Sequence, residues 1–215
     1  MRFEDRAEAG RQLARQLDHL RDEDVVVLGV SRGGVPVAAE VAEALGAPLD
    51  VVVVRKLPTP SQPELGMGAI GEDGVRIVNE GIVRAVGVSR RELADIEEAE
   101  RAELGRQLDL YRGERQSVPL AGSTVIVVDD GIATGVTAWA ACRTARLRGA
   151  RRVVVAVPVA PPRWTAELRD AADEMICLAT PAPYYDTGRW YRDFTPVTDA
   201  DVAVLLAGKT VPGAA

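Results

Sequence analysis

Residues 125–137 read VIVVDDGIATGVT, four apolar residues followed by two carboxylates and a turn of small residues. Apolar residues without polar alternation are typical of a strand that is buried on both faces of a parallel sheet. The small turn opens a predicted helix, where backbone N–H groups and two hydroxyls suit a phosphate. The adjacent Asp129 and Asp130 repel each other unless a cation or donors such as vicinal sugar hydroxyls compensate. The coincidence of these features favours a ribose 5-phosphate site over an ordinary acidic turn.

Other segments repeat this strand–turn–helix pattern. Apolar runs predict buried strands at Val25–Val30, Leu49–Val54, Val153–Val157 and Met175–Leu178. Helical spacing and capping residues predict helices at 4–20, 36–45, 89–112, 137–147, 165–171 and about 198–208. Buried strands that alternate with helices indicate an α/β fold with a mainly parallel sheet, in which ligands bind at the carboxyl ends of the strands.

The chain is interpreted as one domain, 1–215, with a core at about 21–180. Residues 58–74 are rich in Pro and Gly and predict either a binding lid or a β-excursion, before a short strand at about 75–78. A helical insertion is expected at about 79–117, as a structural element or an oligomer contact, and an aromatic flap at about 181–210.

The charge and the amino-acid composition limit the kinds of ligand and the location that we expect. The formal net charge is −6 and no stripe of Lys and Arg stands out, which makes a nucleic acid an unexpected ligand. Two separated cysteines form no metal motif or disulfide framework, and we see no leader or membrane-spanning run, so a cytoplasmic protein is expected. The single histidine, His19, is expected on a helix surface. Lysine is nearly absent, which makes Lys56, beside Arg55, a candidate site residue.

Residues 125–137 resemble the motif of the type I phosphoribosyltransferase family that binds phosphoribosyl pyrophosphate (PRPP). The resemblance implies a Rossmann-like parallel core, an inserted long helix and a small hood. It implies that Asp129 and Asp130 hold the ribose hydroxyls. The 5-phosphate would be cradled by Ala133, Thr134, Gly135, Val136 and Thr137. Gly131 and Val136 depart slightly from the family pattern, but neither change removes a backbone amide.

Two further segments resemble the pyrophosphate-binding parts of that family. Ser31, Arg32, Gly33 and Gly34 follow the first core strand, where the family often holds a non-proline cis peptide, so we expect one near Ser31–Arg32. Arg55 and Lys56 resemble an Arg-Lys pair that contacts pyrophosphate before a closing loop. Here that loop, 59–74 with Glu64, lacks the second cation that some members carry. A dinucleotide site is disfavoured because the six-residue glycine pattern is absent.

Five of the nine aromatic residues fall within 184–194. Aromatic faces suit base stacking, and residues 190–194 resemble the aromatic-Arg-Asp segment of purine-salvage members. This resemblance makes Tyr184, Tyr185, Trp190 and Arg192 candidate acceptor-binding residues. An aromatic mini-core that fixes the flap is the structural alternative.

The resemblance as a whole implies a transferase of nucleotide salvage that moves a 5-phosphoribosyl group from PRPP to a nitrogenous base and releases pyrophosphate. Mg²⁺ would be held mainly by the ligand, near Asp129 and Asp130, the expected catalytic residues. Asp130 is preferred over Glu64 as an acid–base group. Dimers are common in the family, and the acceptor stays open. The alternatives are a non-catalytic PRPP- or nucleotide-binding regulator on the same fold and another pentose-phosphate enzyme.

Overall fold

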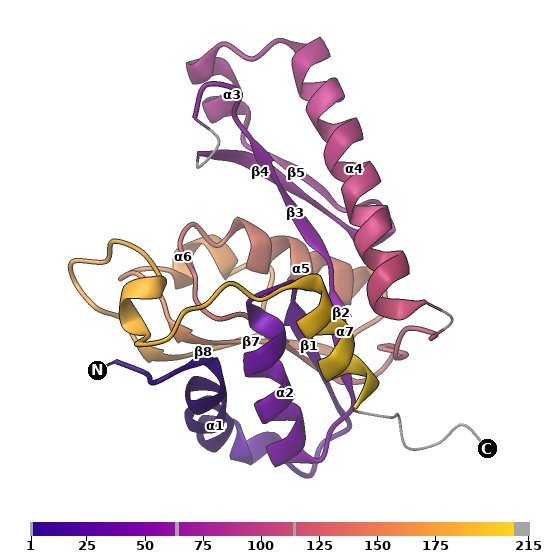
Figure 1. Ribbon diagram of the computed structural model, residues 1–215, viewed down its shortest axis with the longest axis vertical. Coiled ribbons are helices and arrows are strands. Elements are labelled where there is room, and N and C mark those ends of the chain that lie inside the picture. Colours follow the sequence, from indigo (N-terminus) through magenta and orange to yellow (C-terminus); the bar gives the residue numbers. More distant parts are fainter. Residues whose placement is uncertain (1, 63–64, 114, 209–215) are drawn as a thin grey trace.

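The computed structural model describes residues 2–62, 65–113 and 115–208. Its core is a five-stranded parallel sheet with the strand order β2-β1-β6-β7-β8 (Figure 1). The strands are β1 (Val25–Val30), β2 (Leu49–Val52), β6 (Thr124–Val128), β7 (Arg152–Val159) and β8 (Glu174–Ala179). The predicted parallel α/β core is confirmed.

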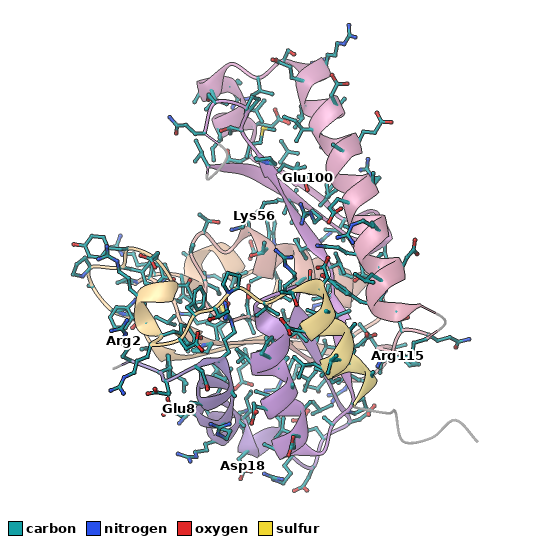
Figure 2. The ribbon with its side chains drawn as sticks, viewed as in Figure 1. Arg2, Glu8, Asp18, Lys56, Glu100 and Arg115 are labelled. Atoms are coloured by element: carbon teal, nitrogen blue, oxygen red, sulfur yellow. The ribbon has the colours of Figure 1, made fainter. Side chains whose placement is uncertain are left out.

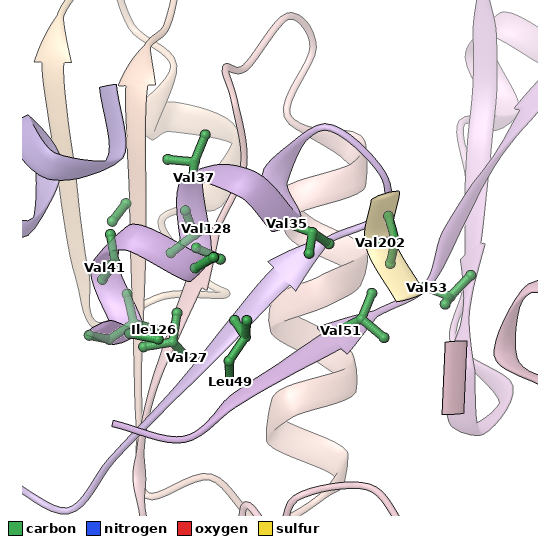
Figure 3. Close-up of a cluster of buried hydrophobic side chains, with 14 of the residues drawn as sticks. Val27, Val35, Val37, Val41, Leu49, Val51, Val53, Ile126, Val128 and Val202 are labelled. Carbon is green, nitrogen blue, oxygen red and sulfur yellow. The ribbon is translucent and has the colours of Figure 1, made fainter. Parts of the chain in front are cut away.

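Helices cover both faces of this sheet. Side chains that alternate along β1 face opposite layers: Val25 and Val27 pack in one cluster, and Val26 and Leu28 pack in another. The first cluster, part of which Figure 3 shows, includes residues of α1 (Arg6–Gln16), α2 (Gly34–Leu45) and α7 (Asp199–Ala207). The second includes residues of α5 (Val136–Leu147) and α6 (Thr165–Leu168). Burial on both faces explains the uninterrupted apolar runs of the sequence.

A small antiparallel sheet projects from the core beside β2 (Figure 1). Its strands are β3 (Val54–Pro58), β4 (Gly66–Gly71) and β5 (Arg76–Val78), in the order β3-β4-β5. The predicted single strand Leu49–Val54 is therefore wrong at its end: β2 pairs with β1 only as far as Val52, opposite Val30, and the chain then enters the second sheet. Of the two alternatives for 58–74, the structure contains the β-excursion.

Two helices follow β5 within the expected insertion. They are α3 (Glu80–Val86) and the long α4 (Arg90–Arg112). Ser89 and Glu92 form the predicted capping box at the start of α4, with the Ser89 hydroxyl accepting from the Glu92 N–H. The lower part of α4 packs beside β3 and α7 (Figure 1). The remaining elements are three short 3₁₀ segments, η1 (Asp18–Leu20), η2 (Glu72–Gly74) and η3 (Gly188–Trp190).

Glu72, buried at 3% exposure, joins the projecting sheet and α4 to the core. Its carboxylate accepts hydrogen bonds from Arg112 of α4 and Arg148, just after α5, at 2.6 Å each, and from the Val53 N–H at 2.8 Å. The contact ties α4 and the end of α5 to the chain between the two sheets. Among the described helices, none is both long and apolar enough to cross a membrane.

Glu72→Gln is expected to lower the free energy of unfolding by at least about 1–3 kcal/mol, because the buried charge shared by Arg112 and Arg148 is lost and only Asp50 and Asp73 remain beside them. Urea denaturation followed by circular dichroism measures this change. Glu4→Gln is the control: Glu4 pairs with Arg192, the two side chains are 63% and 66% exposed, and the pair should contribute less than about 1 kcal/mol. Equal losses in the two variants would contradict the role given to Glu72.

Candidate active site

One cavity of about 680 Å³ lies at the carboxyl ends of β1 and β6, where the core meets the projecting sheet. Figure 2 labels two residues of its wall, Lys56 of β3 and Glu100 of α4. The lining brings together most of the site residues expected from the sequence: Ser31, Arg32, Gly33, Arg55, Lys56, Asp129, Asp130, Ala133, Thr134 and Thr137. It also contains residues that the sequence did not single out, among them Arg6, Glu100, Gln107 and Thr187, and it contains Phe194 from the aromatic cluster of the sequence.

Asp129 and Asp130 directly follow β6 and are held differently. Asp129 Oδ1 accepts from the Asp130 N–H at 2.9 Å. Asp130 Oδ2 accepts a hydrogen bond from Arg6 Nε at 2.9 Å and forms an ion pair with Arg6 Nη2 at 2.9 Å. The Asp130 and Arg6 side chains are only 14% and 11% exposed. The carbonyl of Asp130 accepts from the Tyr191 hydroxyl at 2.6 Å. Asp130 is therefore fixed from both sides, while Asp129 has no cation within ion-pair distance among the described residues.

The pKa values of the two carboxyl groups are both raised. Burial raises the pKa of Asp129 well above its usual range, and the charge of Asp130 raises it further. Burial also raises the pKa of Asp130, against the opposing effect of the Arg6 guanidinium. Such a pair binds a cation or hydroxyl donors best when it is ionised, so a ligand of that kind must compensate for the cost of desolvation.

The loop after the acid pair presents backbone donors. Gly135 has φ of +79° and caps α5, so the chain enters the helix through a residue that tolerates a left-handed conformation. The N–H groups of Ala133, Thr134 and Gly135 donate to no other described residue. Free amides before a twelve-residue helix, with Thr134 and Thr137 lining the cavity, fit an anion.

The loop after β1 lies directly against the acid pair. Its Ser31–Arg32 peptide is cis, which confirms that expectation. A Cβ atom on Gly33 would overlap the Asp130 carboxylate, and one on Gly34 would overlap the Val128 carbonyl. Both glycines are thus required by close approach, although Gly34 itself does not line the cavity. Gly135 and Val136 line a second, more apolar cavity of about 510 Å³ with Trp139.

Two of the three expected pyrophosphate cations carry acidic partners. Arg55 Nε donates to Glu100 of α4 at 2.8 Å. Arg32 lies 3.5 Å from Asp199 at the start of α7. Lys56 forms no ion pair with any residue that the structure describes, and its charge lowers the pKa of both Asp129 and Asp130. The site therefore offers one unpaired ammonium and two oriented guanidinium groups.

The hood is built from both ends of the chain. Phe3 and Tyr191 form an isolated parallel β-bridge, and the Phe3 N–H donates to the Trp190 carbonyl at 2.8 Å. This pairing places Arg6 with its guanidinium 3.9 Å from the centre of the Phe194 ring and with Nη1 2.9 Å from the Thr195 carbonyl. Nothing in the sequence distinguishes Arg6 from the other arginines of its Arg-rich helix.

None of the four residues expected at the acceptor lines the cavity. Tyr184 hydrogen-bonds Thr187 at 2.8 Å, and Tyr185 is 69% exposed beneath Arg189. Trp190 packs against the small buried cluster around Phe3 and Tyr191. Arg192 pairs with Glu4 on the surface. The hood residues that reach the cavity are Arg6, Thr187, Phe194, Pro196 and Val197. Glu64 lies outside the described residues.

Asp129→Asn is expected to stabilise the ligand-free protein at neutral and higher pH. A carboxyl group with a raised folded-state pKa stabilises the fold while protonated and loses that contribution as the pH rises through this pKa. The variant should melt a few degrees higher at about pH 8, since about 1 kcal/mol corresponds to about 2–4 °C at this chain length. The gain should shrink toward about pH 4. A lower melting temperature at both pH values would contradict the assignment.

The model of the phosphoribosyl transferase domain family matches residues 3–184. Proteins of two strains of Mycobacterium tuberculosis, CDC 1551 / Oshkosh and H37Rv, are provisionally named phosphoribosyl transferase and are 51% identical over 204 residues. The match covers 95% of this chain but 46% of those relatives, so the chain spans about half of their length.

Two solved structures show the same fold. The crystal structure of TT1426 from Thermus thermophilus is 41% identical, with a TM-score of 0.81, and the match covers 98% of this chain and 100% of that one. The AQ2163 protein from Aquifex aeolicus is 12% identical, with a TM-score of 0.52 over 85% of this chain and 76% of that one, a likeness of fold alone. The parallel core, the small hood and the matches together show that this chain belongs to the type I phosphoribosyltransferase family.

Proposed function

We propose that the site transfers a 5-phosphoribosyl group from PRPP to a nitrogenous base and releases pyrophosphate. One observation supports this most: a single cavity holds an acid pair, a loop of free backbone amides and a group of cations side by side. Those three parts match the hydroxyls, the 5-phosphate and the pyrophosphate of PRPP. A cytoplasmic enzyme of nucleotide salvage is the corresponding physiological proposal.

The proposed placement follows the charges. The 5-phosphate would lie at residues 133–137, whose amides and hydroxyls are donors without a counter-charge. The ribose hydroxyls would donate to Asp129 and Asp130. The pyrophosphate would lie between Ser31–Gly34 and the pair Arg55 and Lys56, where Lys56 has no acidic partner among the described residues.

Magnesium fits this arrangement as a ligand-borne ion. Carboxylate oxygens are suitable ligands for Mg²⁺, but Oδ2 of Asp130 already accepts a hydrogen bond from Arg6 and forms an ion pair with it. Asp129 is the better candidate ligand, and most of the coordination would come from PRPP and water. When bound, the ion would neutralise charge on the pyrophosphate and so make it a better leaving group.

The residues of this chain would act on a developing positive charge at the anomeric carbon. As the bond to pyrophosphate breaks, Arg32, Arg55 and Lys56 stabilise the charge that collects on the leaving group. A nitrogen lone pair of the base attacks the opposite face of the ribose, and the new carbon–nitrogen bond forms as the carbon–oxygen bond to pyrophosphate breaks. The proton released from that nitrogen passes to Asp130. Asp130 is the proposed acid–base group, and its raised pKa suits proton transfer.

The acceptor side is proposed to be the wall formed by Arg6, Thr187 and Phe194, which reach the cavity from the hood. An aromatic ring and a guanidinium stacked on it offer a flat surface to a planar base. Tyr184 would act on the acceptor indirectly, by holding Thr187. Tyr185, Trp190 and Arg192 would act by building the hood.

Asp129→Asn combined with Asp130→Asn is expected to weaken Mg²⁺-dependent binding of PRPP by more than about 100-fold, because two ionised acceptors are lost. Isothermal titration calorimetry measures the affinity, and circular dichroism checks that the variant is folded. Asp95→Asn with Asp109→Asn makes the same charge change on the exposed side of α4 and should leave the affinity unchanged. Unchanged PRPP affinity in the site variant would overturn the assignment.

Release of pyrophosphate from PRPP, measured with magnesium across a panel of purine and pyrimidine bases, tests the reaction itself. Release with one base establishes the transferase and names its acceptor. Thermal stabilisation by PRPP without release from any base would favour the regulator on the same fold. Turnover of ribose 5-phosphate without use of PRPP would favour another pentose-phosphate enzyme.

A further inference from the structure

The inward face of α4 changes character where it borders the cavity. Glu100, Leu104, Gln107 and Tyr111 recur at spacings of four, three and four residues, so they share one face of the helix. Leu104 and Tyr111 are buried, as a packed helix face requires. Gln107 is equally buried, at 3% exposure, although its side chain is polar.

Gln107 is an exception among buried polar residues because its carbonyl oxygen has no partner. Oε1 is shielded from solvent, and no described group donates a hydrogen bond to it. A buried acceptor without a hydrogen bond costs about 1–3 kcal/mol of stability. A leucine at this position would pack without that cost, as Leu104 does one turn earlier. The residue nevertheless lines the cavity, which is where a missing partner could enter.

The neighbours of Gln107 place it between the two paired arginines of the site. Glu100, seven residues earlier, accepts from Arg55 at 2.8 Å. Tyr111, one turn later, donates its hydroxyl to Asp199 at 2.6 Å, and Asp199 lies 3.5 Å from Arg32. The same helix face thus contacts Arg55 directly and Arg32 through Asp199, with Gln107 in the middle.

We propose that Gln107 contacts the pyrophosphate group of the substrate, so that α4 is a wall of the active site. This inference rests on the proposed function and deepens it. The side-chain amide donates from Nε2 to a phosphate oxygen. Rotation of the side-chain amide toward the ligand would bring Oε1 from its shielded position to the water of the cavity, which supplies the donor that this oxygen lacks.

A neutral amide suits this place better than a further charge. Arg32 and Arg55 already supply positive charge, and Glu100 and Asp199 hold them in position before any ligand arrives. A carboxylate at 107 would add repulsion against pyrophosphate, whereas an amide adds a hydrogen bond to a charged group. Gln107 therefore selects for the pyrophosphate end of the ligand and leaves the 5-phosphate end, at residues 133–137, untouched.

The test compares Gln107→Leu and Gln107→Glu with the unchanged protein. Calorimetry measures the affinity for pyrophosphate and, separately, for ribose 5-phosphate, and thermal melting without ligand measures stability. Gln16→Leu, the same substitution at an exposed position of α1, is the matched control. We expect Gln107→Leu to weaken pyrophosphate binding at least about tenfold, Gln107→Glu to weaken it more, and neither to change ribose 5-phosphate binding.

The melting temperature provides a second readout. Gln107→Leu should melt at the same or a higher temperature than the unchanged protein, because it removes an unpartnered buried acceptor. Unchanged pyrophosphate affinity in both variants overturns the inference, and so does a parallel loss for pyrophosphate and ribose 5-phosphate. If Gln107→Leu unfolds, the nearly isosteric Gln107→Glu decides by the same comparison. An unchanged protein that binds neither ligand overturns the proposed function instead, and this inference with it.

Discussion

The parallel pairing of β1 with β6 is the contact on which the site depends. Gly29 lies opposite Val128 in this register, so both strands end at the same level and their loops meet. Gly33 and Gly34 then pack so closely against Asp130 and Val128 that no larger side chain fits. The loop proposed for pyrophosphate and the acid pair proposed for ribose therefore hold a fixed distance, set by two strands of the central sheet. Such placement on rigid strand ends keeps reacting groups in register without a ligand.

Most charged groups of the site already have a partner of opposite charge, which an ionic ligand would replace. Asp130 is paired with Arg6, Arg55 with Glu100 and Arg32 with Asp199, so none of these groups is buried alone. A charge that is buried without a partner would cost several kcal/mol, which explains the pairing of Asp130 with Arg6, the most buried of the three pairs. An anionic ligand gains the difference between its own contacts and those it displaces. Lys56, exposed and unpaired within the described chain, is the cation that can respond to an anion without first losing a partner.

The sequence predicts the central strands well because a strand buried on both faces leaves a continuous apolar run. It predicts β4 poorly, since Gly66, Gly68 and Gly71 indicate a loop; in the fold, Gly68 is small because the Ile77 carbonyl lies where its Cβ would be. The motif residues meet as expected, because motifs at strand ends are local. Arg6 and Gln107 could not be found this way. Each lies in a polar helical stretch that carries no motif, and only the tertiary fold brings it to the cavity.

The bridge between Phe3 and Tyr191 has a consequence for how the protein is made. Synthesis proceeds from the N-terminus, and domains begin to fold as they emerge. The loops at 31–34 and 129–137 and the pair of Arg6 with Asp130 need no residue beyond 137. The contacts of Arg6 with Phe194 and Thr195 need residues that are made later. The residues of the sugar-facing half of the site are therefore made before the hood residues 191–195 that pack over Arg6.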